Sequence, residues 1–393
     1  MINFELHTLT KVYFGKNQHE RVGEIAAGYG AKKLLMLYGG GSLERSGVLG
    51  AVRASLGSAG VAFEELGGVQ ANPTLEFARV VAQRLGECGA DMILAVGGGS
   101  VLDTAKMAAL AYANKADPWA LLTGDAPAKE MLPLGCILTI AAAGSETSQH
   151  AVLTNMQTGL KRGMGHDLLR PLFAIMNPEL TYTLPPYQTA CGIVDIMMHT
   201  LERYIDLSGT PNDLLDRTSE ALVKAVVAAG SVAMQTADDY EARATLMLGG
   251  SWSHNNMMGA GKEYVMIAHQ LEHELSGIDD SVAHGAGLAV VWPAYLRYVY
   301  LCDVPRFAKM AVRVWNCEMD FDHPEKTALA GIEACEAYFK SIGMPSRISE
   351  FGIGEGQVEL MADKCTNYGA RALKSVKGPL GKEDIMAIYR LCL

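Results

Sequence analysis

The first half of the chain alternates short runs of branched apolar residues with longer segments whose apolar residues recur every three or four positions. This alternation is typical of strands joined by crossover helices, so it predicts a parallel sheet with flanking helices. The predicted strands are residues 33–38, 61–66, 92–96, 135–140 and 173–176, and the predicted helices include 75–88 and 101–113. We therefore expect an α/β domain of the nucleotide-binding type.

The strand pattern fades after about residue 185, where long segments rich in Ala, Leu, Met and Glu begin. The pair Pro185-Pro186 marks this change, because a residue before proline is disfavoured in a helix and proline suits a helix start. A chain of 393 residues is long enough for two domains. We predict an α/β domain over 1–184 and an all-helical domain over 185–393.

Charge and cysteine content narrow the possible partners and the compartment. The chain carries 43 acidic and 33 basic side chains, for a formal net charge of −10, which repels phosphate backbones and anionic lipids. No apolar run approaches the roughly 20 residues of a membrane span. We expect neither a nucleic acid nor a membrane partner. The eight cysteines form no Cys-x-x-Cys pair, and no signal-peptide pattern opens the chain, so we expect the protein in the cytoplasm. Separately, a homodimer is the default assembly for a soluble enzyme.

A glycine-rich turn, Gly97-Gly98-Gly99-Ser100, follows the predicted strand 92–96 and opens a predicted helix. Backbone N–H groups at such a turn, with the helix dipole behind them, can bind a pyrophosphate. The turn lacks the third glycine of the Rossmann fingerprint, and the chain has no P-loop, which disfavours a kinase or an ATPase. A tight connection without a ligand is the alternative interpretation.

Two further turns rich in small residues follow predicted strands. The first contains Gly40, Gly41 and Ser42 and has no carboxylate to hold a ribose hydroxyl. Ser42 and Arg45 leave room for a 2′-phosphate, which favours NADP(H) over NAD(H), although an ordinary turn with a surface arginine is also possible. The second turn runs from Thr139 to Glu146, where small side chains suit either a ligand against the backbone or close packing.

Seven of the ten histidines lie between residues 150 and 284. Asp195 and His199 are four residues apart in a helical pattern, so their side chains leave one helix face and could bind one cation. His269 and His284 could complete a four-ligand shell. One carboxylate with three imidazoles suits Fe²⁺ or Zn²⁺ better than Ca²⁺ or Mg²⁺. Each histidine alone could also be a hydrogen-bonded structural residue.

The segment His269-Gln270-Leu271-Glu272-His273 offers an alternative. It has the His-x-x-Glu-His order of an inverzincin, in which both histidines bind zinc and the glutamate activates a water molecule. A zinc metalloprotease of this kind would leave the glycine-rich turns and the pair of Asp195 and His199 unexplained.

Taken together, these segments resemble the iron-containing (group III) alcohol dehydrogenases, in the branch of butanol dehydrogenases and NADPH-dependent aldehyde reductases. The resemblance runs nearly end to end and includes residues 38–42, 97–106, 138–146, 181–186, 195–199 and 269–293. It implies an N-terminal dinucleotide-binding domain and a helical C-terminal domain in a dehydroquinate synthase-like architecture, with nicotinamide and metal meeting between them. The implied reaction is hydride transfer between NAD(P)(H) and a primary alcohol or aldehyde. A related metal-dependent lyase is the other possibility.

The resemblance also implies roles for individual residues. Asp195, His199, His269 and His284 fall on the family's metal positions, and His273 falls on a histidine close to the substrate, where it could relay a proton. The implied cofactor-binding residues are Gly97, Gly98, Ser100, Asp103, Thr139 and Lys161, with Gly40, Gly41 and Ser42 near the adenosine end.

Overall fold

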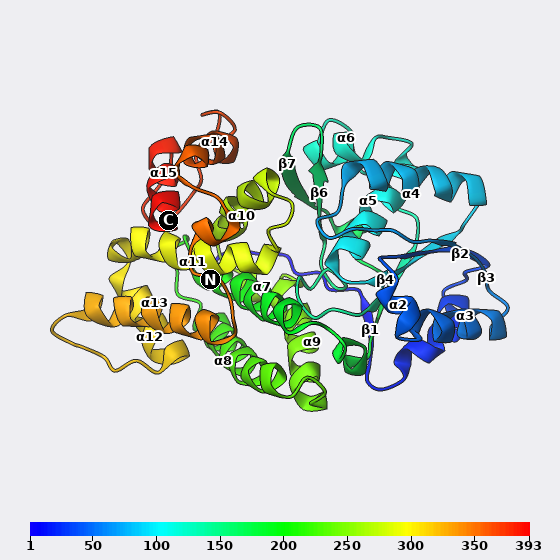
Figure 1. Cartoon of the computed structure of the whole chain (residues 1–393), viewed down its shortest axis with the longest axis horizontal. Helices are drawn as coiled ribbons and strands as arrows, with labels where there is room; N and C mark the ends of the chain where they lie inside the picture. The colour runs from blue at the N-terminus through cyan, green and yellow to red at the C-terminus, as the bar shows by residue number, and fades with distance from the viewer. The chain divides into compact units, whose positions relative to one another are not determined.

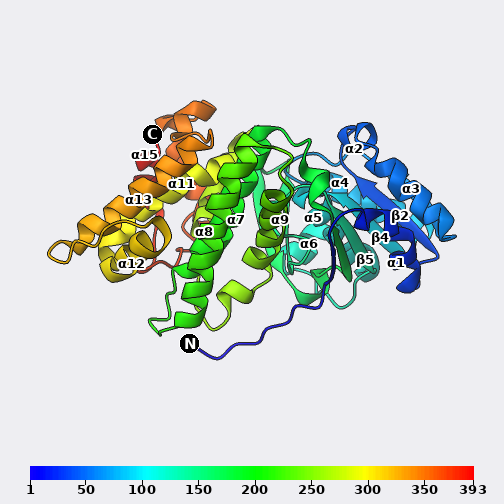
Figure 2. The same ribbon diagram turned by 90° about the horizontal axis from the view of Figure 1, so that it is seen from below.

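The structure is a computed structural model that describes all 393 residues, and its internal contacts divide the chain into two compact units (Figures 1 and 2). The sheet unit consists of His7–Leu184 and Thr236–Asn255, and the helical unit consists of Met1–Leu6, Pro185–Gln235 and Asn256–Leu393. The sequence predicted two continuous domains. In the structure, Met1–Leu6 belongs to the helical unit and Thr236–Asn255 belongs to the sheet unit, so neither unit is one continuous segment. Each unit is described separately below.

The sheet unit is built on a six-stranded sheet in the order β1-β8-β5-β4-β2-β3. All neighbouring strands are parallel. The strands are β1 (Lys11–Phe14), β2 (Lys33–Tyr38), β3 (Ala62–Leu66), β4 (Met92–Gly97), β5 (Leu134–Leu138) and β8 (Phe173–Met176). Every residue of β4 and β5 is buried, as expected for central strands covered on both faces. The predicted parallel α/β layer is confirmed.

Helices cover both faces of this sheet (Figures 1 and 2). On one face, α4 (Leu75–Cys88) and α5 (Gly99–Asn114) pack on Leu35 and Leu37 of β2. On the other face, α1 (Val22–Gly28) and α3 (Val48–Ser58) pack on Leu34 and Met36. Successive residues of β2 point to opposite faces, so this one strand serves both cores.

Shorter elements complete the first part of the sheet unit. They are the 3₁₀ helices η1 (Gln18–Arg21), η2 (Asp167–Leu169) and η3 (Pro178–Thr181), the helices α2 (Ser42–Arg45) and α6 (Pro118–Thr123), and the strands β6 (His150–Asn155) and β7 (Leu160–Gly165). Strands β6 and β7 form an antiparallel pair outside the main sheet. Neither this hairpin nor the edge strand β1 was among the strands predicted from the sequence.

Helix α9 (Tyr240–His254) packs with the sheet unit although it lies far along the chain. The Ser251 hydroxyl donates a hydrogen bond to the Glu146 carboxylate, and the Thr147 hydroxyl donates to the Ser251 carbonyl at 3.3 Å. Gly144 has φ +65°, and a Cβ placed there would lie 2.4 Å from the Gly250 carbonyl oxygen. The turn after β5 therefore holds α9 by close backbone contact.

The helical unit contains no strand, which confirms the prediction for the second half of the chain. Its α-helices are α7 (Pro186–Tyr204), α8 (Asp213–Gln235), α10 (Ile267–Ile278), α11 (His284–Val299), α12 (Val304–Trp315), α13 (Pro324–Ser341), α14 (Glu355–Cys365) and α15 (Lys382–Leu391). The 3₁₀ helices are η4 (Met257–Gly259), η5 (Tyr300–Cys302) and η6 (Ile348–Phe351). None of the helices combines the length and the apolar character needed to cross a membrane.

Helix α7 is the centre of the helical unit's packing around the predicted metal residues. It packs against α8, α10 and α11, and its last sixteen residues are almost entirely buried. The approach of α11 is especially close, because a Cβ at Gly285 would lie 2.2 Å from the Cys191 carbonyl oxygen. Only glycine permits this distance, which sets the position of the neighbouring His284.

Candidate functional site

Three helices of the helical unit bring the four predicted metal residues together. Asp195 and His199 lie on α7, His269 lies on α10 and His284 is the first residue of α11. The Oδ1 atom of Asp195 is 3.3 Å from His199 Nδ1, 3.5 Å from His269 Nε2 and 3.9 Å from His284 Nε2. One carboxylate oxygen therefore faces one nitrogen of each imidazole.

The centre of this cluster is buried, and one side is more open. Asp195, His199 and His269 are each less than a tenth exposed, whereas the His284 side chain is 26% exposed. Asp195 Oδ1 and His269 Nε2 are buried and make no hydrogen bond of ordinary geometry. Buried polar atoms without partners are costly, and a shared cation satisfies both. One oxygen and three nitrogen donors fit a divalent transition ion such as Fe²⁺ or Zn²⁺.

Charge and burial compete in setting the protonation of these residues. Burial alone raises the pKa of Asp195, but the nearby His199, His269 and His284 outweigh it and hold that pKa below its usual value. Burial lowers the pKa of His199 well below its usual value, although Asp195 opposes the shift. Burial lowers the pKa of His269 as well, but Glu202 and Asp195 more than compensate and raise it to about 9. The cluster therefore favours an ionised carboxylate.

Two carboxylates contact these histidines: Glu202, which the sequence analysis did not name, and Glu272, which it named only as the water-activating glutamate of the metalloprotease alternative. Glu202 of α7 pairs with Nδ1 of His269, and Glu272 of α10 pairs with Nδ1 of His284. Glu202 follows His199 by three residues and Glu272 follows His269 by three, but neither spacing points to the histidine that the carboxylate contacts. The same spacing is common on helix surfaces, so it does not by itself indicate a hydrogen bond to a histidine.

His273 lies beside the cluster and is half-buried. Its ring centroid is 5.8 Å from that of His284, and the potential ligand atoms of Glu272, His273 and His284 lie within 4.8 Å of one another. The tightest grouping, of Asp195, His199 and His269, includes neither His273 nor His284, but His284 Nε2 lies 3.9 Å from Asp195 Oδ1. This position, next to the more open side of the cluster, is compatible with contact to a substrate.

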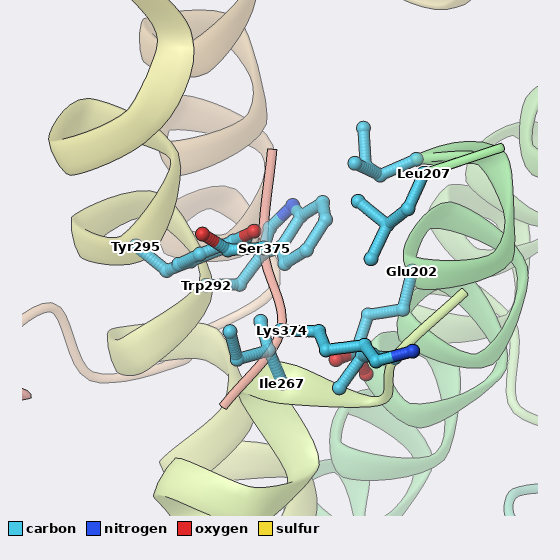
Figure 3. Close-up of a pocket in the computed structure, with 9 residues that line it drawn as sticks. Glu202, Leu207, Ile267, Trp292, Tyr295, Lys374 and Ser375 are labelled. Atoms are coloured by element: carbon cyan, nitrogen blue, oxygen red, sulfur yellow. The ribbon is translucent and has the colours of Figure 1, made fainter. Parts of the chain in front are cut away.

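A small pocket adjoins Glu202 (Figure 3). Its lining includes Trp292 and Tyr295 of α11 and, from farther along the chain, Lys374 and Ser375. The pocket has room for about one water molecule. It is too small for an alcohol together with a nicotinamide ring, so it is not the substrate site.

In the sheet unit, the glycine-rich turn 97–100 joins β4 to α5. Gly98 is the N-cap of α5, and no side chain caps this end of the helix. Ile140 and Ala143 pack closely on the turn, since a Cβ at Gly98 would lie 2.9 Å from Ile140 and one at Gly99 would lie 3.2 Å from Ala143. This end of α5 has no side-chain cap, so its backbone N–H groups are compatible with the pyrophosphate site that remains a prediction for Gly97, Gly98 and Ser100.

A buried lysine, Lys106, organises the segment after Thr139. Its ammonium group donates hydrogen bonds to Ser145 Oγ at 2.8 Å and to the carbonyls of Ser148 and His150 at 2.9 and 2.8 Å. Burial lowers the pKa of Lys106 to about 8. Asp103 accepts from Ser145 Oγ at 2.6 Å and from the backbone N–H of Val152 at 3.0 Å. Asp103 therefore holds the segments of Ser145 and Val152 in place, in addition to its predicted contact with the cofactor.

The remaining predicted cofactor residues are distributed around the same unit. Thr139 follows β5, is buried, and donates its backbone N–H to Gly97 at 3.0 Å. Lys161 lies on β7, is buried, and donates to Asn72 Oδ1 at 3.0 Å. The hydrogen bond from Thr139 places it beside the turn 97–100. Asn72 was not predicted, although Lys161 was.

The second glycine turn lies where β2 ends. Gly41 is the N-cap of α2, Ser42 is its first residue, and a Cβ at Gly41 would lie 3.3 Å from the Arg45 guanidinium. The neighbouring Arg53 is already engaged, with Glu44 at 2.8 Å and with both oxygens of Glu65 at 2.8 Å. Arg45 is therefore the cation placed to meet a group bound over this turn.

Comparison with known proteins identifies the family. The family model for iron-containing alcohol dehydrogenase matches residues 10–178, and the model for the C-terminal part of the Fe-containing alcohol dehydrogenase family matches residues 189–393. The chain belongs to the iron-containing alcohol dehydrogenase family. It is thus an alcohol or aldehyde oxidoreductase that depends on a nicotinamide cofactor and a divalent metal.

Relatives of this alcohol dehydrogenase cover nearly its whole length. It is 36% identical to NADH-dependent butanol dehydrogenase A of Clostridium acetobutylicum, over 99% of both chains. It is 34% identical to the NADPH-dependent aldehyde reductase YqhD of Escherichia coli, over 95% of both. The crystal structure of an NADH-dependent butanol dehydrogenase A from Thermotoga maritima has a TM-score of 0.95 and 33% identity, covering 100% of this chain and 99% of that one.

Membership of the alcohol dehydrogenase family leaves the metalloprotease alternative without support. An inverzincin would need Glu272 beside a water molecule that attacks a peptide. In this alcohol dehydrogenase Glu272 has no exposed surface, and its carboxylate is paired with His284. Glu272 therefore holds a histidine and is not available to activate a water molecule.

Proposed function

We propose that this enzyme interconverts a primary alcohol and its aldehyde, using one divalent ion held by Asp195, His199, His269 and His284. The observation that carries the proposal is the convergence of three imidazole nitrogens on one oxygen of Asp195, within 3.9 Å. Fe²⁺ and Zn²⁺ both suit these donors, and the ion that the cell supplies decides between them.

The reaction moves a hydride, with its electron pair, between nicotinamide C4 and the carbonyl carbon, and a proton between the substrate oxygen and solvent. When bound, the ion supplies Lewis-acid stabilisation of negative charge on the substrate oxygen. The protein's own residues bind and orient the substrate and the cofactor, and they exclude water from the site. The burial of Asp195 and His199 keeps this electrostatic stabilisation strong, because charges interact more strongly where water is excluded.

We assign the proton transfer to His273. Its half-buried ring lies beside His284, on the more open side of the cluster, and an imidazole can accept and release a proton near neutral pH. A His273→Ala variant that kept full activity over a wide pH range would remove this assignment.

For the cofactor, we propose that the turns 97–100 and 40–42 hold the pyrophosphate and the adenosine end, with Asp103, Thr139 and Lys161 beside them. NADP(H) is favoured, because no carboxylate follows β2 directly and Arg45 folds against Gly41. The relatives do not decide this preference, since one is named for NADH and another for NADPH. We place the enzyme in the cytoplasm as a homodimer acting on small alcohols and aldehydes.

The direct test is an assay of the purified protein with butanal and either NADPH or NADH, before and after removal of metal by a chelator. We expect consumption of reduced cofactor, faster with NADPH, which chelation abolishes and Fe²⁺ or Zn²⁺ restores. A protein that consumes neither cofactor with any aldehyde would contradict the proposal and favour a metal-dependent lyase of the same fold.

A further inference from the structure

The three helices that carry the candidate metal ligands are joined in series by two carboxylates. Glu202 of α7 pairs with His269 of α10, and Glu272 of α10 pairs with His284 of α11. Each histidine is therefore held by a carboxylate from the preceding helix of the cluster. Helix packing alone does not require this arrangement, because an apolar side chain could fill the same volume.

Both carboxylates are deeply buried, with exposures of 1% for Glu202 and 0% for Glu272. Burial of a carboxylate is costly unless hydrogen bonds compensate it, so these positions demand a specific partner. Glu202 Oε1 also accepts the backbone N–H of Ala268 at 2.6 Å, which ties the first turn of α10 to α7. Glu272 lies against α11, because a Cβ at Gly287 would be 2.7 Å from Glu272 Cγ.

The hydrogen bonds also select one form of each imidazole. A neutral imidazole has one N–H and one nitrogen with a free electron pair. When Nδ1–H donates to the carboxylate, the free pair lies on Nε2, and Nε2 is the atom of both His269 and His284 that faces Asp195. The carboxylates thus hold the two rings in the orientation and the tautomer that a metal ligand requires.

We propose that Glu202 and Glu272 are positioning residues that raise the affinity of the site for its divalent ion by orienting His269 and His284. This inference rests on the proposed metal site. It makes a graded prediction for Glu272, since glutamine keeps a hydrogen-bond acceptor and loses the charge, whereas leucine loses both. Affinity should fall in the order Glu272, E272Q, E272L.

The test is a titration of metal-free protein with Co²⁺, followed by the absorption spectrum of the bound cobalt, and with Zn²⁺ in competition with a chelator. We expect E272L to bind either ion about 10- to 100-fold more weakly, E272Q to show a smaller loss, and the cobalt bands of both to change. E202Q should also weaken binding, but its contact with Ala268 makes it the second choice because folding is at risk. Thermal unfolding of the metal-free proteins reports whether each variant folds.

A matched control is E220Q. Glu220 is another buried carboxylate of the helical unit, and it bonds to the Tyr204 hydroxyl at 2.8 Å and to Arg313 at 3.3 Å. Its loss should leave the cobalt spectrum and both affinities unchanged. If E272L binds Co²⁺ and Zn²⁺ as tightly as the unaltered protein, the positioning role is wrong and the metal site stands. If the unaltered protein binds neither ion, both the positioning role and the proposed function are wrong.

Discussion

Individual side chains matter in the candidate metal centre because each supplies a single ligand atom. His199 is the clearest case, since it lies one helical turn from Asp195 and its Nδ1 is 3.3 Å from Asp195 Oδ1. Helix α7 contains no second histidine. Its loss should therefore affect metal binding more than folding.

We expect His199→Ala to lose its metal and its dehydrogenase activity together, with kcat reduced at least about 100-fold, the scale seen when one electrostatic contributor to a transition state is removed. Metal analysis, cofactor oxidation and circular dichroism on the same preparation measure the three quantities. His323→Ala is the control, because His323 is an exposed histidine of the same unit. An H199A protein with a full complement of metal would contradict the assignment.

Glu146 gives a prediction about pH and stability. Burial raises the pKa of this carboxyl, and its Oε2 is buried without a hydrogen bond. Above the unfolded pKa of about 4.5 the folded protein holds the proton more tightly than the unfolded chain, so the free energy of unfolding falls as pH rises through the raised pKa.

Glu146→Gln removes this titration and keeps an acceptor for Ser251. The unfolding temperatures of E146Q and the unaltered protein should be similar near pH 4, and E146Q should be the more stable at pH 8. Differential scanning fluorimetry over this range measures the difference. Glu241→Gln on the exposed side of α9 controls for the loss of one negative charge. A difference that shrinks as pH rises would show that the carboxylate is stabilising.

Arg45 provides the test of cofactor preference. Because its guanidinium lies by Gly41 and Arg53 is engaged by two glutamates, Arg45 is the group expected to meet a 2′-phosphate. Arg45→Ala should raise the KM for NADPH about tenfold, equivalent to roughly 1.4 kcal/mol, and leave the KM for NADH unchanged. Equal effects on both cofactors would place Arg45 elsewhere in binding.

At the scale of residues, the sequence predicts a group of metal ligands but not the groups that orient them. The spacing of Asp195 and His199 indicates one helix face without any knowledge of packing, and the structure brings His269 and His284 to the same oxygen. The pairing of Glu202 with His269 and of Glu272 with His284 was not predicted, because each pair joins two helices, and Glu272 had been considered only as the glutamate of the metalloprotease alternative. Which histidine a glutamate meets depends on how helices cross, and periodicity carries no information about this.

Among the elements, the contact of α11 with α7 controls the site most directly. Gly285 follows His284, and its close approach to Cys191 leaves no space for a side chain. Gly285→Ala should push the start of α11 away from α7, destabilise the protein by about 1–3 kcal/mol and weaken metal binding.

Thermal unfolding and metal analysis of G285A measure these two effects. Gly356→Ala is the matched control, since Gly356 lies in α14 and a Cβ there meets nothing within 4 Å. That variant should be as stable as the unaltered protein or slightly more stable, because alanine favours a helix over glycine. A stable, fully metallated G285A would mean that α11 can shift without moving His284.

Elements with a strong apolar pattern could be predicted at this scale, and strands of mixed polar and small residues could not. The predicted segments 33–38, 75–88 and 173–176 coincide with β2, α4 and β8. Strands β6 and β7 lie outside the main sheet and mix polar and small residues, so their sequence lacks the alternation of a half-buried strand. Lys161 was predicted through the family resemblance, and its place on β7 was not.

At the scale of the whole molecule, the metal ion and the nicotinamide cofactor are predicted to bind to residues of different units. The metal residues all lie in the helical unit, and the glycine-rich turns all lie in the sheet unit. A ligand stabilises the structure to which it binds by mass action, so each ligand should protect its own unit against local opening.

Hydrogen-exchange mass spectrometry can test this separation. Zn²⁺ should slow exchange in α7, α10 and α11, and NADPH should slow exchange around residues 97–106 and 139–145. Addition of a chelator should reverse only the first effect. Protection by Zn²⁺ centred on the glycine-rich turns would contradict the assignment of the metal to the helical unit.

The sequence also predicted a change of architecture near residue 185 but missed the return of α9 to the sheet unit. The pattern of α9 is that of an ordinary helix, and its attachment depends on Ser251 and on the close contact at Gly144. Such contacts join residues more than a hundred positions apart. They follow from the three-dimensional path of the chain and leave no local signal.

The most direct measurement is anomalous diffraction from crystals of the metal-loaded enzyme, collected at the absorption edge of iron or zinc. A single strong peak is expected at bonding distance, about 2.0–2.2 Å, from a carboxylate oxygen of Asp195 and one nitrogen each of His199, His269 and His284. A peak bound to other residues, or a loaded and active enzyme with no peak among these four, would contradict the account.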